Sequence, residues 1–392
     1  MRKTKIIATL GPATDDPKIL TKLLQRVDVV RINLAHGSWG AKDKASHQKK
    51  IRMVRKISKK IKKPIAILVD LKGNKIRIGN FKNEAIELKK NSLITIRFTE
   101  EEISRHDKEI VVNADYVFDN VAVKDTILLD DGLIKLEVKK IQSKKRQLTC
   151  KVHEGGLLLR GKGLEVSNKI INQPGLNEGD KKDLKRLAKL DIDWVALSFV
   201  NQASDVNQAR EVLSGLNSNT KLIAKIERVA AINQLYWIIK ASDGIMVARG
   251  DLALECGPGE LTGLQKNIIK QTVQGNKIVI TATQMMESMI HNPTPTRAEM
   301  TDVSNAVLDG TDAVMLSAET AIGKYPIETV ESMSEVCSGA ELYEESISKS
   351  DTFKFSELQR VDEAIAVSSI SIARNMNIKA ILFFQGESDT YL

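Results

Sequence analysis

Residues 221–227 read Lys-Leu-Ile-Ala-Lys-Ile-Glu, and residues 244–252 read Gly-Ile-Met-Val-Ala-Arg-Gly-Asp-Leu. Each segment is a short apolar run that ends in charge, which is typical of a buried strand reaching a polar edge. Lys225 and Glu227 point the same way on a strand. Glu227 and Asp251 offer the oxygen ligands that suit Mg²⁺, and an ammonium beside that ion suits a transferring phosphoryl group. A Lys-x-Glu pair alone favours a structural ion pair. The residues at the ends of the other strands therefore decide between a structural pair and a functional site.

Similar apolar runs recur along the chain and alternate with amphipathic helical patterns. The eight runs cover residues 5–9, 27–33, 65–71, 194–199, 221–227, 244–249, 278–284 and 313–317. The helical patterns include residues 17–24, 46–61, 181–190 and 203–213. A strand followed by a helix, eight times, predicts an α/β fold, the (β/α)8 TIM barrel, whose continuous apolar strands suit a parallel sheet covered on both sides.

The interval between residues 71 and 194 is too long for one strand–helix unit. It contains strand-like runs at 85–88, 93–98, 109–112, 125–129, 134–140 and 147–152. Asp130-Asp131-Gly132 is a turn signal between two of them. We therefore predict an inserted all-β (β-barrel) lid domain at 74–168 in a catalytic barrel of residues 1–73 and 169–345, because insertions after a barrel strand lie at the catalytic face.

The last segment has the pattern of a helix at 361–376 and an apolar strand at 380–384. One helix and one strand cannot form a core by themselves. Residues 346–392 are therefore expected to be the truncated start of a C-terminal α/β domain, whose unpaired apolar strand would favour aggregation.

Composition narrows the class of protein. The chain has 392 residues, 42% of them hydrophobic and 28% charged, which suits a soluble protein of two or three domains with no membrane-spanning run. The net charge of +9 comes from scattered lysines, and aromatic residues make up only 4%, so a nucleic-acid surface is not expected. Three widely spaced cysteines suit free thiols in the cytoplasm.

Polar and charged residues follow nearly every predicted barrel strand at the same pole. They include Thr9, Arg31, Asn33, Asp70, Ser198, Lys225, Glu227, Arg249, Asp251, Thr283 and Ser317. Any one of the small polar residues could be a helix cap, but together the groups describe a site for a polyanion with a metal ion. His36 alone favours a structural, hydrogen-bonded histidine, and we do not predict that it is a catalytic base.

Several long motifs resemble the pyruvate kinase family. They cover residues 4–14, 131–133, 241–252, 281–289, 292–299 and 305–320, so the resemblance runs along the chain. It implies transfer of the phosphoryl group of phosphoenolpyruvate to ADP, which gives pyruvate and ATP. Glu227 and Asp251 would then hold Mg²⁺ or Mn²⁺, and Lys225 would stabilise the phosphoryl group and the developing enolate.

The resemblance also implies roles for the remaining residues. The backbone at Gly250 and Asp251 would bind the substrate carboxylate together with Thr283, and Thr283 and Ser317 would lie near the enolate carbon. Arg31 would contact the transferring phosphoryl group as well as the nucleotide. The implied nucleotide-binding residues are Arg31, Asn33, His36, Arg77 and Lys162, with a second Mg²⁺.

The chain departs from the family where many members bind K⁺. Ala35 and Leu71 stand where the family has Ser and Thr, and Lys75 stands where it has Glu. A hydroxyl ligand is missing, and a lysine ammonium can supply the charge of the ion. Lys75, with Leu71, Asp70 and Asn33, is therefore predicted to replace the monovalent cation, so that K⁺ is not required.

Further expectations concern partners and alternatives. The shortened C-terminal region predicts no response to the family's usual effectors, and the barrel is expected to form a dimer or tetramer. The alternatives are a catalytically inactive remnant that serves as a binding or scaffold protein, a barrel lyase acting on a 2-oxo acid, and a nucleic-acid binder. The inactive remnant is disfavoured because the expected active-site residues are intact, namely Arg31, Lys225, Glu227, Asp251 and Thr283. The lyase is disfavoured because it would not need the lid residues Arg77 and Lys162.

Overall fold

The computed structural model describes residues 2–40, 46–81, 83–99, 108–130, 132–167, 176–257, 259–348, 361–376, 378 and 381. The chain divides into two compact units, Met1–Leu342 and Tyr343–Leu392. The three domain ranges expected from the sequence stay a prediction.

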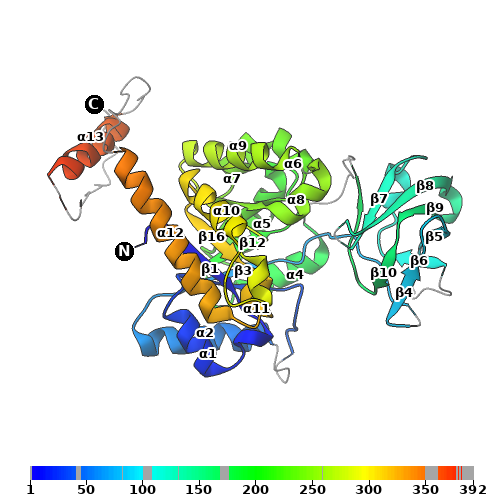
Figure 1. The fold of residues 1–392 in the computed structure, drawn as a ribbon, viewed down its shortest axis with the longest axis horizontal. Coiled ribbons are helices and arrows are strands. Elements are labelled where there is room, and N and C mark those ends of the chain that lie inside the picture. The colour runs from blue at the N-terminus through cyan, green and yellow to red at the C-terminus, as the bar shows by residue number, and fades with distance from the viewer. Residues whose placement is uncertain are drawn as a thin grey trace. The chain divides into compact units, whose positions relative to one another are not determined.

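A closed barrel of parallel strands forms the centre of the first unit (Figure 1). Its strands are β1 (Lys5–Thr9), β2 (Val29–Asn33), β3 (Ala66–Asp70), β12 (Trp194–Leu197), β13 (Lys221–Ile226), β14 (Gly244–Ala248), β15 (Ile278–Ala282) and β16 (Ala313–Leu316). They pair in the order β1-β16-β15-β14-β13-β12-β3-β2. Each strand lies within one of the eight predicted runs, and the ends differ by at most two residues, so the TIM barrel is confirmed.

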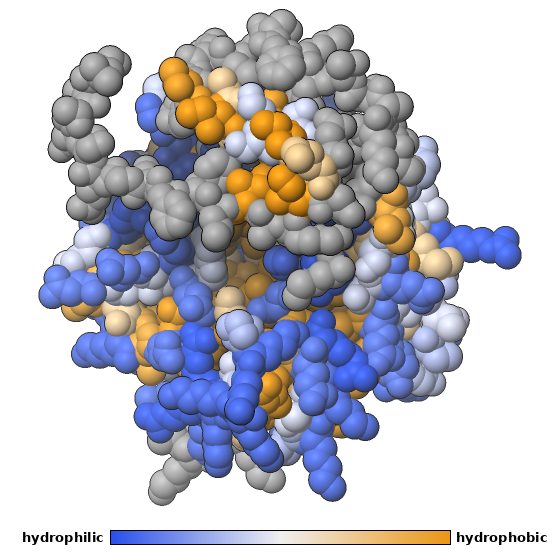
Figure 2. Space-filling view, turned by 90° about the vertical axis from the view of Figure 1, so that its left-hand side faces the viewer, coloured by the Kyte–Doolittle hydropathy of each residue, from blue (hydrophilic) through white to orange (hydrophobic). Residues whose placement is uncertain are grey.

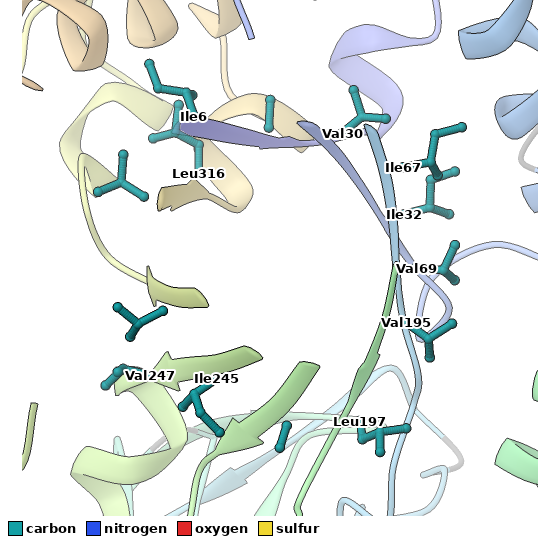
Figure 3. Packing of buried hydrophobic residues seen from close by; sticks show 14 of the residues in the cluster. Ile6, Val30, Ile32, Ile67, Val69, Val195, Leu197, Ile245, Val247 and Leu316 are labelled. Carbon is teal, nitrogen blue, oxygen red and sulfur yellow. The ribbon is translucent and has the colours of Figure 1, made fainter. Parts of the chain in front are cut away.

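Strand alternation divides the barrel side chains between two apolar clusters. Figure 3 shows the outward set, which includes Ile6, Val30, Ile67 and Val247 and packs into the large core shared with the helices. The residues between them fill the inside of the barrel, among them Ile7, Leu68, Ala196, Ile223, Met246 and Ile280. Both faces of the sheet are therefore buried, as its continuous apolar strands predict.

Helices cover the outside of the barrel (Figure 1). They are α1 (Pro17–Leu24), α2 (His47–Ile61), α4 (Glu178–Leu187), α5 (Ala203–Ser214), α6 (Val229–Asn233), α7 (Leu235–Ala241), α8 (Arg249–Cys256), α9 (Leu261–Gln274), α10 (Arg297–Leu308), α11 (Ala318–Ala321) and α12 (Pro326–Ser348). Single 3₁₀ turns lie at Pro12–Thr14 and Glu287–Ile290. Helix α4 begins three residues earlier than predicted, because the Asn177 side chain caps it by accepting a hydrogen bond from the Asp180 amide at 2.7 Å.

The inserted region forms its own β-structure around a separate apolar core. One sheet has the order β11-β7-β8-β9-β5-β6, and β10 pairs with β4. The elements are β4 (Ala85–Leu88), β5 (Leu93–Phe98), β6 (Glu109–Val112), α3 (Val117–Asn120), β7 (Thr126–Leu129), β8 (Ile134–Gln142), the 3₁₀ turn Ser143–Lys145, β9 (Gln147–Glu154), β10 (Gly156–Leu159) and β11 (Leu164–Val166). The six predicted strands are present. Strands β10 and β11 were missed because they are short and interspersed with glycines, which weaken a strand pattern.

In the second unit, α13 (Val361–Asn375) confirms the predicted helix at 361–376. The predicted strand at 380–384 lies outside the described residues, apart from Ile381. Figure 2 shows one face of the molecule, much of which is covered by hydrophilic side chains. Within the described part of the chain, no helix combines the length and the apolar character needed to cross a membrane.

Candidate active site

Strand alternation turns charged side chains into the carboxyl end of the barrel. Lys225 follows the inward-facing Ile223 by two residues, and Asp70 follows the inward-facing Leu68 in the same way. Arg31 stands between Val30 and Ile32, which face outward. The apolar residues of β2, β3 and β13 are therefore buried, while Arg31, Asp70 and Lys225 near their carboxyl ends face one another.

These charges form one buried network. Arg31 donates from Nε and Nη2 to Asp70 at 2.8 and 2.6 Å, and from Nη1 to Thr9 at 3.1 Å. The Lys225 ammonium lies 3.3 Å from Asp70 and 2.8 Å from Glu227. Asp70 and Glu227 are only 1% exposed, so the two cations offset a large cost of burying carboxylates.

Ser198 bridges this network and was not predicted to have a role beyond its place at a strand end. Its hydroxyl accepts from Lys225 at 2.8 Å and lies within 2.9 Å of the Leu71 carbonyl and 3.2 Å of Asp70. The amide of the next residue, Phe199, donates to Glu227 at 2.5 Å. The end of β12 therefore fixes the positions of both Lys225 and Glu227.

Asp70 and Lys225 stabilise each other's charged forms. Burial alone would raise the pKa of Asp70, but Lys225 and Arg31 outweigh burial and hold it below its usual value. Burial alone would lower the pKa of Lys225, and the carboxylates of Asp70 and Glu227 outweigh it in the same way, so that this pKa is raised. Burial and the neighbouring Asp251 raise the pKa of Glu227 against the pull of Lys225.

Glu227 and Asp251 line the same small cavity, of about 30 Å³, together with Lys75, Phe199 and other residues of the barrel and the insertion. The described residues contain no group of three His, Cys, Asp or Glu side chains that could chelate a metal ion alone. Glu227 and Asp251 offer carboxylate oxygens of the kind that Mg²⁺ prefers, and substrate oxygens and waters would complete its shell. The residues therefore fit the predicted metal.

Thr283 lies directly beside the start of α8. Its hydroxyl accepts from the Gly250 amide at 2.9 Å and donates to the Ala282 carbonyl at 2.6 Å. The backbone of Thr283 is left-handed, with φ of 69°. This conformation is rare for a β-branched residue.

A second cavity, of about 510 Å³, lies next to the network. It is lined by Arg31, Asn33, His36 and Ser317, together with Thr9, Gly11, Asp15, Lys50 and others. Its volume is in the range of small-molecule and cofactor sites. The structure thus brings together three of the predicted nucleotide-binding residues and Ser317.

Three charged residues of the insertion bear on the predicted nucleotide site, namely Arg77, Lys162 and Asp130. Partial burial lowers the pKa of His36, and the charges of Arg77 and Arg31 lower it further. Arg77 donates to the Gly161 carbonyl at 2.9 Å, next to Lys162, whose ammonium lies 2.7 Å from Asp130.

The Lys75 ammonium has a different setting from the one that the sequence suggests. It lies 2.7 Å from Asp251 and 3.7 Å from Glu165. Asp70, by contrast, is held by Arg31 and Lys225, and Asn33 accepts from the Ala35 amide. The side chain of Leu71 packs into the core outside the barrel and offers no ligand. The cation of Lys75 therefore lies at Asp251 and not at Asp70 or Asn33.

Comparison with known proteins agrees with this geometry. A family model described as the barrel domain of pyruvate kinase matches residues 1–330. A protein of Buchnera aphidicola subsp. Schizaphis graminum named pyruvate kinase is 44% identical over 397 aligned residues. The chain belongs to the pyruvate kinase family.

The family relatives are longer than this chain. The alignment covers 100% of the chain and 81% of that Buchnera pyruvate kinase. A Staphylococcus aureus pyruvate kinase is 40% identical over 386 residues, which cover 97% of the chain and 64% of that protein.

The strand pattern predicted the strand-end residues but not how they contact one another. The sequence assigned no contacts to Ser198, Thr9, Phe199 or Asp302, which hold other polar residues at this end of the barrel through hydrogen bonds. The only signal for Ser198 and Phe199 was their place at the end of the predicted strand 194–199, just beyond the last residue of β12. Asp302 lies in the middle of α10, where nothing in the local sequence marks it.

Proposed function

We propose that this chain is a Mg²⁺-dependent (or Mn²⁺-dependent) kinase that transfers the phosphoryl group of phosphoenolpyruvate to ADP. The observation that carries the proposal is the buried Arg31–Asp70–Lys225–Glu227 network in a chain of the pyruvate kinase family. Preorganised cations stabilise a phosphoryl group in transfer because no reorganisation is needed when its charge develops.

In this mechanism the bond from phosphorus to the enol oxygen breaks, and a bond to an oxygen of the ADP β-phosphate forms. Lys225 and Arg31 neutralise the oxygens of the phosphoryl group. Glu227 and Asp251 would hold a divalent ion, which would supply positive charge to the substrate oxygens. Thr283 and the Gly250–Asp251 backbone orient the substrate carboxylate. The enolate carbon then takes up a proton by way of water beside Thr283 and Ser317.

The second cavity is the proposed nucleotide site. Arg31, Asn33 and His36 line it, and Arg77 and Lys162 of the insertion would close over the phosphates. Assembly through the barrel, as a dimer or tetramer, belongs to the same proposal.

We also propose that the reaction does not require K⁺, because Lys75 brings a cation to this end of the barrel and Leu71 offers no oxygen ligand. The test is pyruvate formation from phosphoenolpyruvate, ADP and Mg²⁺, with KCl or with tetramethylammonium chloride at equal ionic strength. Equal rates are expected. Activation of several-fold by KCl would contradict the role of Lys75 and leave the kinase intact, and no pyruvate in either salt from folded protein would contradict the kinase.

A further inference from the structure

The guanidinium of Arg249 makes an unusual number of contacts for a residue outside the proposed reaction. Arg249 is the first residue of α8, and it is 7% exposed. Its acceptors are the carbonyl oxygens of Ala282, Thr283 and Gln284, the carboxylate of Asp302, the sulfur of Met285 and the amide oxygen of Gln265. The shortest bonds are those to Asp302, 2.7 Å to each oxygen, and to the Thr283 carbonyl, 2.6 Å.

The carbonyls that accept from Arg249 belong to a strained piece of backbone. Thr283 and Gln284 are consecutive residues with φ of 69° and 52°. Left-handed backbone is costly for residues other than glycine and persists only where the surroundings hold it in place. A planar fork with five N–H donors, anchored on one side by a carboxylate, can hold two successive carbonyls in this way.

The strain has a consequence at the site. The left-handed turn directs the Thr283 hydroxyl to the Gly250 amide, at 2.9 Å. Gly250 separates Arg249 from the proposed metal ligand Asp251. One side chain therefore links the backbone that orients Thr283 to the helix start that carries Asp251.

We infer that Arg249 is a positioning residue, which holds the Thr283–Gln284 backbone in its left-handed form so that Thr283 and Gly250 stay aligned for the substrate carboxylate. The inference rests on the proposed function for the meaning of that alignment. Asp302 acts indirectly, because it holds the Arg249 guanidinium in place. A lysine could keep the ion pair with Asp302 but could not reach both carbonyls with a planar fork.

The test combines Arg249→Lys with relief of the strain at Gln284, whose side chain is exposed. Arg249→Lys is expected to lower kcat/KM for phosphoenolpyruvate about 100-fold, as small misplacements of reacting groups do, with the KM for ADP changed less than about twofold. Adding Gln284→Gly should restore about tenfold of that loss, because glycine adopts positive φ without a steric penalty. Gln284→Gly alone should change kcat/KM less than about threefold.

Asn276→Gly is the matched control, since Asn276 also has positive φ, at 51°, but lies outside the site. It should give no rescue. Equal rescue by Gln284→Gly and Asn276→Gly would overturn the inference, and so would the absence of rescue by Gln284→Gly. Turnover by the wild-type protein would still support the proposed kinase activity in either case.

Crystal structures of these variants test the inference independently of any measurement of activity. Arg249→Lys should lose the left-handed backbone at 283–284, and the double variant should keep it. A Lys variant that retains both that backbone and the Thr283–Gly250 hydrogen bond would overturn the inference, whereas an inactive wild type would overturn only the proposed function.

Discussion

The charges of the barrel and those of the insertion are held in opposite ways. In the barrel, Lys225 and Asp70 are 8% and 1% exposed, and each contacts several partners. In the insertion, the Lys162 side chain is 37% exposed and pairs with Asp130. Removing one partner of a buried charge lowers the stability of the fold strongly, whereas an exposed ion pair contributes little to that stability. The barrel thus carries a fixed electrostatic site, whereas Lys162 of the insertion is a charge that can change partners.

The largest effect is expected for Lys225→Met. Loss of the ammonium leaves Asp70 and Glu227 short of a buried partner, and it removes the cation proposed to stabilise the phosphoryl group. We expect kcat to fall about 10³-fold, as for loss of one preorganised stabilising group. The free energy of unfolding should fall by about 3 kcal/mol, as for a broken buried pair. Steady-state kinetics and urea unfolding measure the two.

Lys221→Met is the control on the same strand. Lys221 is exposed and lies 3.8 Å from Asp243, so its loss should change stability by less than about 1 kcal/mol and leave kcat unchanged. If the two variants behaved alike, the contrast between buried and exposed charge would not govern this site.

The sequence predicted the barrel because eight apolar runs are long enough to show a local pattern, and it predicted Lys225 and Glu227 because both stand at a strand end. It did not predict which strand ends touch. Ser198 and Asp70 lie 128 residues apart, and Arg249 and Asp302 lie 53 residues apart. Such contacts are set by strand order and helix packing in three dimensions. The left-handed backbone at Thr283 was missed for a related reason, since Arg249 and not the local sequence stabilises it.

A smaller effect is expected where the two regions meet, at Lys75. Its ammonium occupies an oxygen of Asp251, so it competes with a divalent ion for the same carboxylate. Lys75→Met should therefore tighten Mn²⁺ binding in the absence of substrate by about tenfold, which corresponds to about 1.4 kcal/mol. Electron paramagnetic resonance of free and bound Mn²⁺ measures the affinity. Lys162→Met, which removes a lysine paired with Asp130, should leave the affinity unchanged. Weaker binding in Lys75→Met would contradict the competition.

The smallest effect concerns His36, where the charge of the insertion reaches the barrel. Partial burial, Arg77 and Arg31 lower the pKa of His36 below 6.5, so the ring is neutral at pH 7. The unfolded chain binds this proton more readily, and the contribution of His36 to stability is therefore complete above about pH 6.5 and declines as the pH falls through the window between the unfolded and folded pKa values. Proton NMR titration, assigned with His36→Gln, follows the ring. Arg77→Met should raise the pKa of His36, while Arg160→Met, at another arginine of the insertion, should not. An unchanged pKa in Arg77→Met would mean that Arg77 does not approach the barrel in solution, and its proposed contact with the nucleotide would then require the insertion to move when the nucleotide binds.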